Sequence, residues 1–148
     1  MPYTLTQIRI LRAPVERVWR ALTEPAAIVK WNPPDGFTAI VHELDLREGG
    51  RFRMSFVNFA NGQAHGFGGS YRKVVPNEKL VATDRFEDEN LPGEMLITYS
   101  LRAVSCGTEL LVEQAGLPDA IPAEACRLGW QQSFDLLARL VEAEVPSA

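Results

Sequence analysis

The clearest hydrophobic pattern in the chain lies near its C-terminus, between residues 122 and 144. Trp130, Phe134, Leu137 and Val141 recur at intervals of four, three and four residues, which places them on one face of an α-helix. A long helix with an aromatic-rich face has to bury that face against another part of the molecule. The pattern therefore predicts a C-terminal helix packed on a surface that the rest of the chain supplies.

The N-terminal part of the chain predicts one strand and two short helices. Residues 3–11 alternate between two faces, as a strand does. Pro14 is expected at the first position of a helix, because its fixed φ suits that position, and the buried stripe of this helix is Val15, Val18, Trp19 and Leu22. A second short helix is expected to begin at Pro25 and to run to Trp31. The Asn-Pro-Pro-Asp-Gly cluster at 32–36 predicts a loop.

Between this loop and the C-terminal helix, alternating segments separated by turn residues predict six further strands. They are expected at 38–45, 51–58, 64–75, 79–87, 94–103 and 108–114. Their short connections favour antiparallel pairing of consecutive strands. Gly66, Gly68 and Gly69 lie inside the longest of them. Glycine within a strand often marks a bulge or a tight bend, so these residues indicate a curved sheet.

Composition and charge narrow the class of protein. The 148 residues suffice for one domain over 1–148, with 46% hydrophobic and 23% charged residues. A net charge of −4 gives no electrostatic reason to expect nucleic acid or an anionic membrane as partner. The segment MPYTLTQIRILRAP does not have the pattern of a secretory leader. Cys106 and Cys126 are therefore expected to be free thiols, and the protein is expected in the cytoplasm.

Several segments together resemble one protein superfamily. They are APVERVWRALTEPAAIVKWNPP, LREGGRFRMSF, GGSYRKVVPNEKLVATDRF, GTELLVEQAGL and GWQQSFDLLARLV. In this order they resemble the START-like, or SRPBCC, superfamily, and within it the homologues of the activator of Hsp90 ATPase (AHSA type). The resemblance implies an α+β helix-grip (Bet v 1-like) fold, in which a curved seven-stranded antiparallel sheet wraps round the long C-terminal helix. It also implies a gap between sheet and helix that often holds an apolar ligand in relatives.

Strand parity predicts which side chains face the C-terminal helix, because alternate residues share a face. The inward set is mostly apolar, and its polar members are His65, Tyr71, Asp84, Tyr99 and Gln114. Apolar walls with a few polar groups are typical of a small-molecule site, and the alternative is a solid core. The candidate ligand-binding residues are Trp31, Met54, Phe56, His65, Phe67, Tyr71, Asp84, Phe86, Tyr99, Trp130, Phe134 and Leu137.

Few residues suggest catalysis or metal binding. His65 and Asp84 lie on consecutive predicted strands, so an acid–base pair is one interpretation, and a surface histidine with a strand-end aspartate is the other. No catalytic residue is assigned. His42, His65, Cys106 and Cys126 lack metal-ligand spacing, so neither a metal nor a cofactor is expected. Trp31 is interpreted either as a gate at the mouth of a pocket or as an anchor for its helix.

Three functions remain open at this point. The favoured hypothesis is a protein that binds an apolar or aromatic small molecule between the C-terminal helix and the sheet. The alternative is an enzyme of the cyclase, hydrolase or isomerase type that acts on a hydrophobic carbonyl compound in the same cavity. The further alternative, suggested by the family name, is a chaperone-interacting module. The sequence does not report the oligomeric state, and homodimers occur among helix-grip proteins.

Overall fold

The structure is a computed structural model that describes residues 2–146. It contains ten elements in the order strand, two helices, six strands, helix, which is the predicted α+β arrangement. Their bounds are β1 (Tyr3–Leu11), α1 (Val15–Thr23), α2 (Pro25–Trp31), β2 (Phe37–Leu44), β3 (Arg51–Asn58), β4 (Ala64–Val75), β5 (Lys79–Phe86), β6 (Met95–Val104), β7 (Gly107–Leu117) and α3 (Ala123–Glu142). Within the described residues, none of the helices is both long and apolar enough to cross a bilayer.

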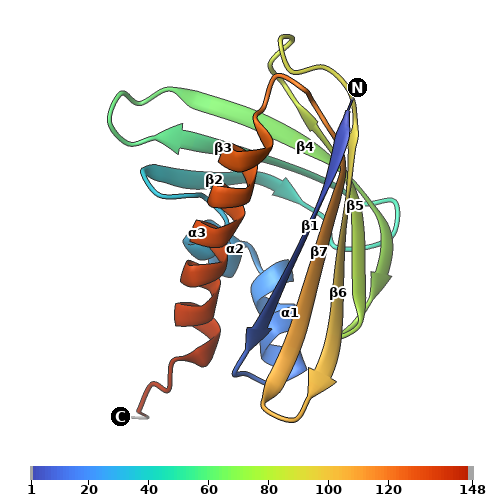
Figure 1. Cartoon of the computed structure of the whole chain (residues 1–148), viewed down its shortest axis with the longest axis vertical. Coiled ribbons are helices and arrows are strands. Elements are labelled where there is room, and N and C mark those ends of the chain that lie inside the picture. Colours follow the sequence, from blue (N-terminus) through green and yellow to red (C-terminus); the bar gives the residue numbers. More distant parts are fainter. Residues whose placement is uncertain (1, 147–148) are drawn as a thin grey trace.

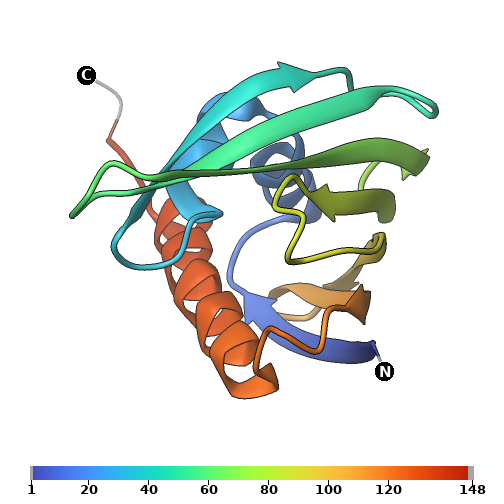
Figure 2. The ribbon, with the colours of Figure 1, turned by 90° about the horizontal axis from the view of Figure 1, so that it is seen from above.

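All seven strands form one antiparallel sheet in the order β1-β7-β6-β5-β4-β3-β2. The sheet is strongly curled, and α3 lies across its concave side (Figure 1). Seen from above, β2, β3 and β4 arch over one side of α3 while β1 and β7 lie on the other (Figure 2). The helix-grip fold implied by the resemblance is confirmed.

The glycines of β4 allow the sheet to curl without losing its register. A Cβ on Gly69 would lie 2.0 Å from the carbonyl oxygen of Thr83 on β5, so only glycine fits this close approach. The β3–β4 pairing nevertheless runs without a shift from Arg51–Ser70 to Val57–Ala64. The irregularity comes later, between Tyr71 and Lys73 in the pairing with β5. The side chains of β4 up to Tyr71 therefore keep the facing that alternation predicts.

The two halves of α3 have different surroundings. Phe134, Leu137 and Val141, in its C-terminal half, are at most 2% exposed and pack in the main hydrophobic core with residues of α1, β6 and β7. Trp130, one helical turn before Phe134, is only partly buried. The predicted stripe is thus one continuous face, but only its C-terminal part is solid core.

Two predicted boundaries are wrong by one or two residues. Pro14 is the N-cap of α1, with extended φ and ψ of −66° and 153°, and not its first helical residue. Proline fits there because the N-cap precedes the helical turn. At the other end of the chain, α3 ends at Glu142, two residues before the predicted position. Ala143 already adopts an extended conformation, so the apolar stripe and the helix end together.

Candidate functional site

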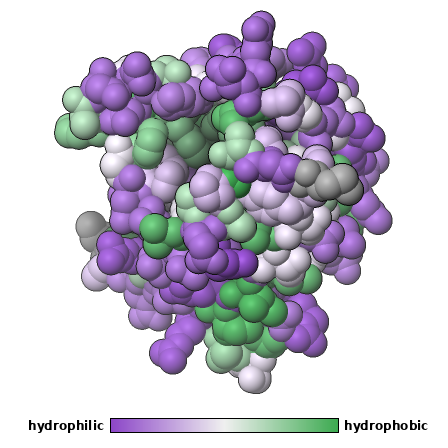
Figure 3. Space-filling model, turned by 45° about the horizontal axis from the view of Figure 1, so that its top comes forward, coloured by the Kyte–Doolittle hydropathy of each residue, from purple (hydrophilic) through white to green (hydrophobic). Residues whose placement is uncertain are grey.

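A pocket of about 330 Å³ lies between the curled sheet and the N-terminal half of α3. Figure 3 shows a hollow in the surface whose recessed part is hydrophobic. Ten of the twelve predicted ligand-binding residues line this pocket: Trp31, Met54, Phe56, His65, Phe67, Tyr71, Asp84, Phe86, Tyr99 and Trp130. The other two, Phe134 and Leu137, do not line it. They belong to the core, because the curl of the sheet brings β6, β7 and α1 against this part of α3.

Aromatic rings form most of the pocket wall. Phe56 and Phe67 meet edge to face with their centroids 4.8 Å apart, and Phe52 and Tyr71 lie 5.4 Å apart. On the α3 side, the ring of Trp130 contacts Tyr99 at 6.3 Å. Such rings are rigid and expose apolar faces, which suits contact with an apolar or aromatic molecule.

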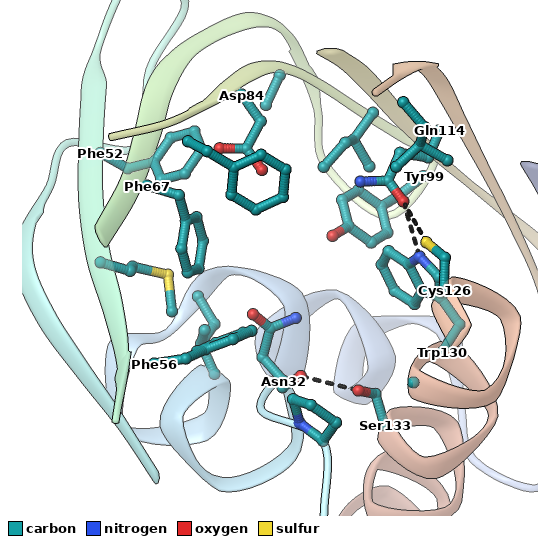
Figure 4. Close-up of a pocket in the computed structure, with 18 of the residues that line it drawn as sticks. Asn32, Phe52, Phe56, Phe67, Asp84, Tyr99, Gln114, Cys126, Trp130 and Ser133 are labelled. Carbon is teal, nitrogen blue, oxygen red and sulfur yellow. Dashed lines mark hydrogen bonds between the residues drawn. The ribbon is translucent and has the colours of Figure 1, made fainter. Parts of the chain in front are cut away.

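Asp84 on β5 is the buried carboxyl group of this pocket (Figure 4). It is only 6% exposed, and its Oδ1 has no hydrogen-bond partner among the described residues. Burial raises the pKa of Asp84 to about 7, although the backbone N–H of Arg85 opposes the rise. A carboxyl group of this kind changes its charge near neutral pH, within an otherwise apolar site.

Two tyrosines share the pocket with Asp84. Tyr71 comes from β4 and Tyr99 from β6, and neither hydroxyl donates or accepts a hydrogen bond within the described residues. Burial raises the pKa of Tyr71 to about 12. Burial also raises the pKa of Tyr99, and the negative charges of Asp84 and Tyr71 add to this effect. Both hydroxyls therefore stay protonated at neutral pH and can donate a hydrogen bond to a bound molecule.

His65 and Asp84 do not form the acid–base pair that was one interpretation of the sequence. Phe67 pairs with Phe86, so His65 and Asp84 lie four residues apart along the strands. At about 3.3 Å per residue this is a separation of about 13 Å. His65 is exposed, and its ring meets that of Phe37 at 6.4 Å. Both residues line the pocket, but they share a face of the sheet without contact.

Gln114 on β7 connects the sheet to α3 and fixes this part of the wall. Its Oε1 accepts hydrogen bonds from Trp130 Nε1 at 2.9 Å and from Cys126 Sγ at 3.7 Å (Figure 4). Its Nε2 donates to Met95 Sδ at 3.5 Å. The amide is thereby engaged with the protein on both sides. Gln114 was identified as an inward polar residue, but it was not among the predicted site residues.

The opposite side of the pocket is fixed by hydrogen bonds to the backbone. Ser133 Oγ donates to the carbonyl oxygen of Asn32 at 2.8 Å and ties α3 to the loop after α2. Trp31 Nε1 donates to the carbonyl oxygen of Ala21 at 2.7 Å, and the residue is 2% exposed. Trp31 therefore acts as an anchor between α2 and α1, the second interpretation of the sequence, while part of its ring still lines the pocket.

The pocket wall also includes small residues of α3 that the sequence interpretation missed. Ala125, Gly129 and Ser133 recur every four residues and all line the pocket. A Cβ built on Gly129 would meet no atom within 4 Å, so the missing side chain leaves open space. This spacing is a signal in the sequence, since it places small side chains on one helical face beside the aromatic stripe.

Comparison with known proteins identifies the family. The model of the activator of Hsp90 ATPase homolog 1-like protein family matches residues 12–142. A solved structure from Chromobacterium violaceum is 52% identical, with a TM-score of 0.95 over 97% of this chain and 100% of that chain. One from Rhizobium leguminosarum is 27% identical, with a TM-score of 0.78 over 97% of each chain. Comparison with curated proteins gives no match. The family match, which covers most of the chain, and the helix-grip fold lead to one conclusion: this chain belongs to the activator of Hsp90 ATPase homolog 1-like family.

Proposed function

We propose that this protein binds an apolar, aromatic small molecule in the pocket between α3 and the curled sheet. The family and the fold suggest a ligand-binding or a chaperone-associated module. The observation that favours ligand binding is the pocket itself, which has aromatic walls and a single buried carboxyl group. A volume of about 330 Å³ falls within the range of small-molecule sites.

Gly129 supports the proposal from the side of the helix. Glycine inside a helix costs about 0.5–1 kcal/mol relative to alanine. No backbone contact requires it here, because a Cβ would meet only open space. The residue gives up helix stability and widens the pocket, which is the exchange expected where a ligand has to fit.

The driving force for binding is the removal of apolar surface from water. Each Å² of buried apolar surface contributes about 25 cal/mol, before the costs of ordering and lost motion. The aromatic walls come from three strands and from α3, so a ligand of the size of two fused rings has apolar contacts on several sides.

A matched pair of variants at Gly129 tests the proposal. Titration with the apolar dye N-phenylnaphthylamine, monitored by its fluorescence, should give saturable binding to the wild-type protein. Gly129→Phe places a ring in the open space and is expected to weaken binding about ten-fold or more. Gly129→Ala adds one methyl group and is expected to keep the wild-type affinity within about two-fold. Equal binding to all three proteins would place the dye elsewhere and would contradict the proposal.

The alternative is an enzyme that uses the same pocket. The observation in its favour is Asp84, whose pKa of about 7 suits a general acid or base, beside the protonated hydroxyls of Tyr71 and Tyr99. A base next to two hydroxyl donors could move a proton adjacent to a carbonyl group and stabilise the resulting oxyanion. Turnover of a hydrophobic ketone that is retained in Asp84→Asn would exclude this role.

The further alternative is association with a chaperone, as the family description suggests. Exposed apolar side chains would be the basis of such contact, and Ile8 and Ile10 on the edge strand β1 are 59% and 43% exposed. If a chaperone-associated role were primary, the chain would change the ATPase rate of Hsp90, and Ile8→Ser would abolish this effect. We favour ligand binding because the pocket has the composition of a site, whereas these side chains form a small patch.

A further inference from the structure

The ionisable groups of the pocket are unbalanced in charge. Asp84 is its carboxylate, and no lysine or arginine lines it within the described residues. His65 is the other group of the lining that can carry a positive charge near neutral pH, and it lies about 13 Å away along the strands. An ionised Asp84 therefore has no counter-ion from this part of the chain.

The elements packed around Asp84 supply dipoles and rings in place of charges. β4 contributes the hydroxyl of Tyr71, and β6 contributes that of Tyr99. β7 contributes Gln114, whose amide is already bonded to Trp130, Cys126 and Met95. The remaining titratable group of the lining is the Cys126 thiol on α3, and burial raises its pKa. The negative charge of Asp84 thus faces two hydroxyls and several aromatic rings.

Building on the ligand-binding function proposed above, we propose that the ligand is an aromatic amine-bearing molecule whose protonated nitrogen binds Asp84. The ammonium group would donate a charge-assisted hydrogen bond to the carboxylate. The rings of Tyr71 and Tyr99 would also attract a cation placed over their faces. The apolar part of the molecule would fill the space between Phe56, Phe67 and Gly129.

Other ligand chemistries fit these groups less well. A carboxylate ligand would bring a second negative charge next to Asp84 in an apolar site, which is unfavourable. An alcohol would form a hydrogen bond but would leave the charge of Asp84 without compensation. An uncharged hydrocarbon would leave Oδ1 of Asp84 without any partner. Only a cation satisfies both the charge and the hydrogen bond.

Three probes of the same shape test this inference by isothermal titration calorimetry at pH 8. They are naphthylmethylamine, naphthylmethanol and methylnaphthalene. The amine is expected to bind at least about ten-fold more tightly than the alcohol, the usual size of a charge-assisted hydrogen bond. In Asp84→Asn this preference should disappear, while the affinity for the alcohol changes by less than about three-fold. Equal affinities for amine and alcohol, or a preference that survives in Asp84→Asn, would overturn the inference.

The wild-type protein alone gives a second readout, which does not depend on the folding of the variant. With a pKa near 7, Asp84 is roughly one-tenth ionised at pH 6 and nine-tenths ionised at pH 8. The amine stays protonated over this range, so its affinity should rise about ten-fold, whereas that of the alcohol should not rise. An amine affinity that is constant or falls with pH would contradict the inference.

The failure of this inference can be distinguished from the failure of the proposed function. If methylnaphthalene and the alcohol bind as well as the amine, the pocket binds apolar molecules and only the amine assignment is wrong. If none of the three probes binds, the ligand-binding function is wrong, and the inference fails with it.

Discussion

At the scale of single residues, Asp84 has the largest consequence for stability. Its pKa is raised from 3.8 to about 7 because burial disfavours the charged form. The folded protein therefore binds a proton between these pH values that the unfolded chain has already released. The sign follows from linkage: this residue causes stability to fall as pH rises from about 4 to about 7, and the loss persists above that range.

We expect Asp84→Asn to remove this pH dependence. A shift of about three pKa units corresponds to roughly 4 kcal/mol, an order-of-magnitude figure for a buried group. The difference in free energy of unfolding between variant and wild type should therefore move in favour of the variant, by a few kcal/mol, from pH 5 to pH 8. Urea unfolding at both pH values measures it. A difference that stays constant within about 0.5 kcal/mol would show that Asp84 is not buried as described.

The sequence predicted that Asp84 faces the helix, because strand alternation determines facing. It did not predict the relation of Asp84 to His65, because that depends on the pairing register between β4 and β5. The absence of a partner for Oδ1 was also beyond reach from the sequence, since hydrogen bonding at a buried carboxyl depends on side chains from three strands.

At the scale of elements, α3 combines two roles along one face. Its aromatic stripe was predicted correctly, because helical periodicity is a local property of the chain. The sequence did not show where core ends and pocket begins, because the curvature of the sheet decides which part of the helix it touches. Small residues at Ala125 and Gly129 and large ones at Phe134 and Leu137 match this division.

We therefore expect substitutions along α3 to differ according to their position. Leu137 is fully buried, so Leu137→Ala should reduce the free energy of unfolding by about 2–5 kcal/mol through lost burial and a new cavity. Leu128 on the same helix is 54% exposed, and Leu128→Ala should change it by less than about 0.5 kcal/mol. Chemical denaturation of both variants makes the comparison. Equal losses at the two positions would contradict the division of α3.

At the scale of the whole molecule, the pocket results from the curl of one sheet around one helix (Figures 1 and 2). The close approach of β4 to β5 at Gly69 shows how tightly the backbones are placed there. The strand order and the number of strands follow from short connections and turn residues, so the sequence predicted them. The size of the gap did not follow, because it is set by twist and coiling accumulated over seven strands.

The three tryptophans allow the central claim, that the pocket binds an apolar molecule, to be tested in one measurement. Trp130 lines the pocket on α3, whereas Trp19 packs in the core and does not line it. In an NMR titration with methylnaphthalene at saturating concentration, the indole N–H resonance of Trp130 should shift and that of Trp19 should stay in place. No shift of Trp130, or equal shifts of both resonances, would contradict binding in this pocket.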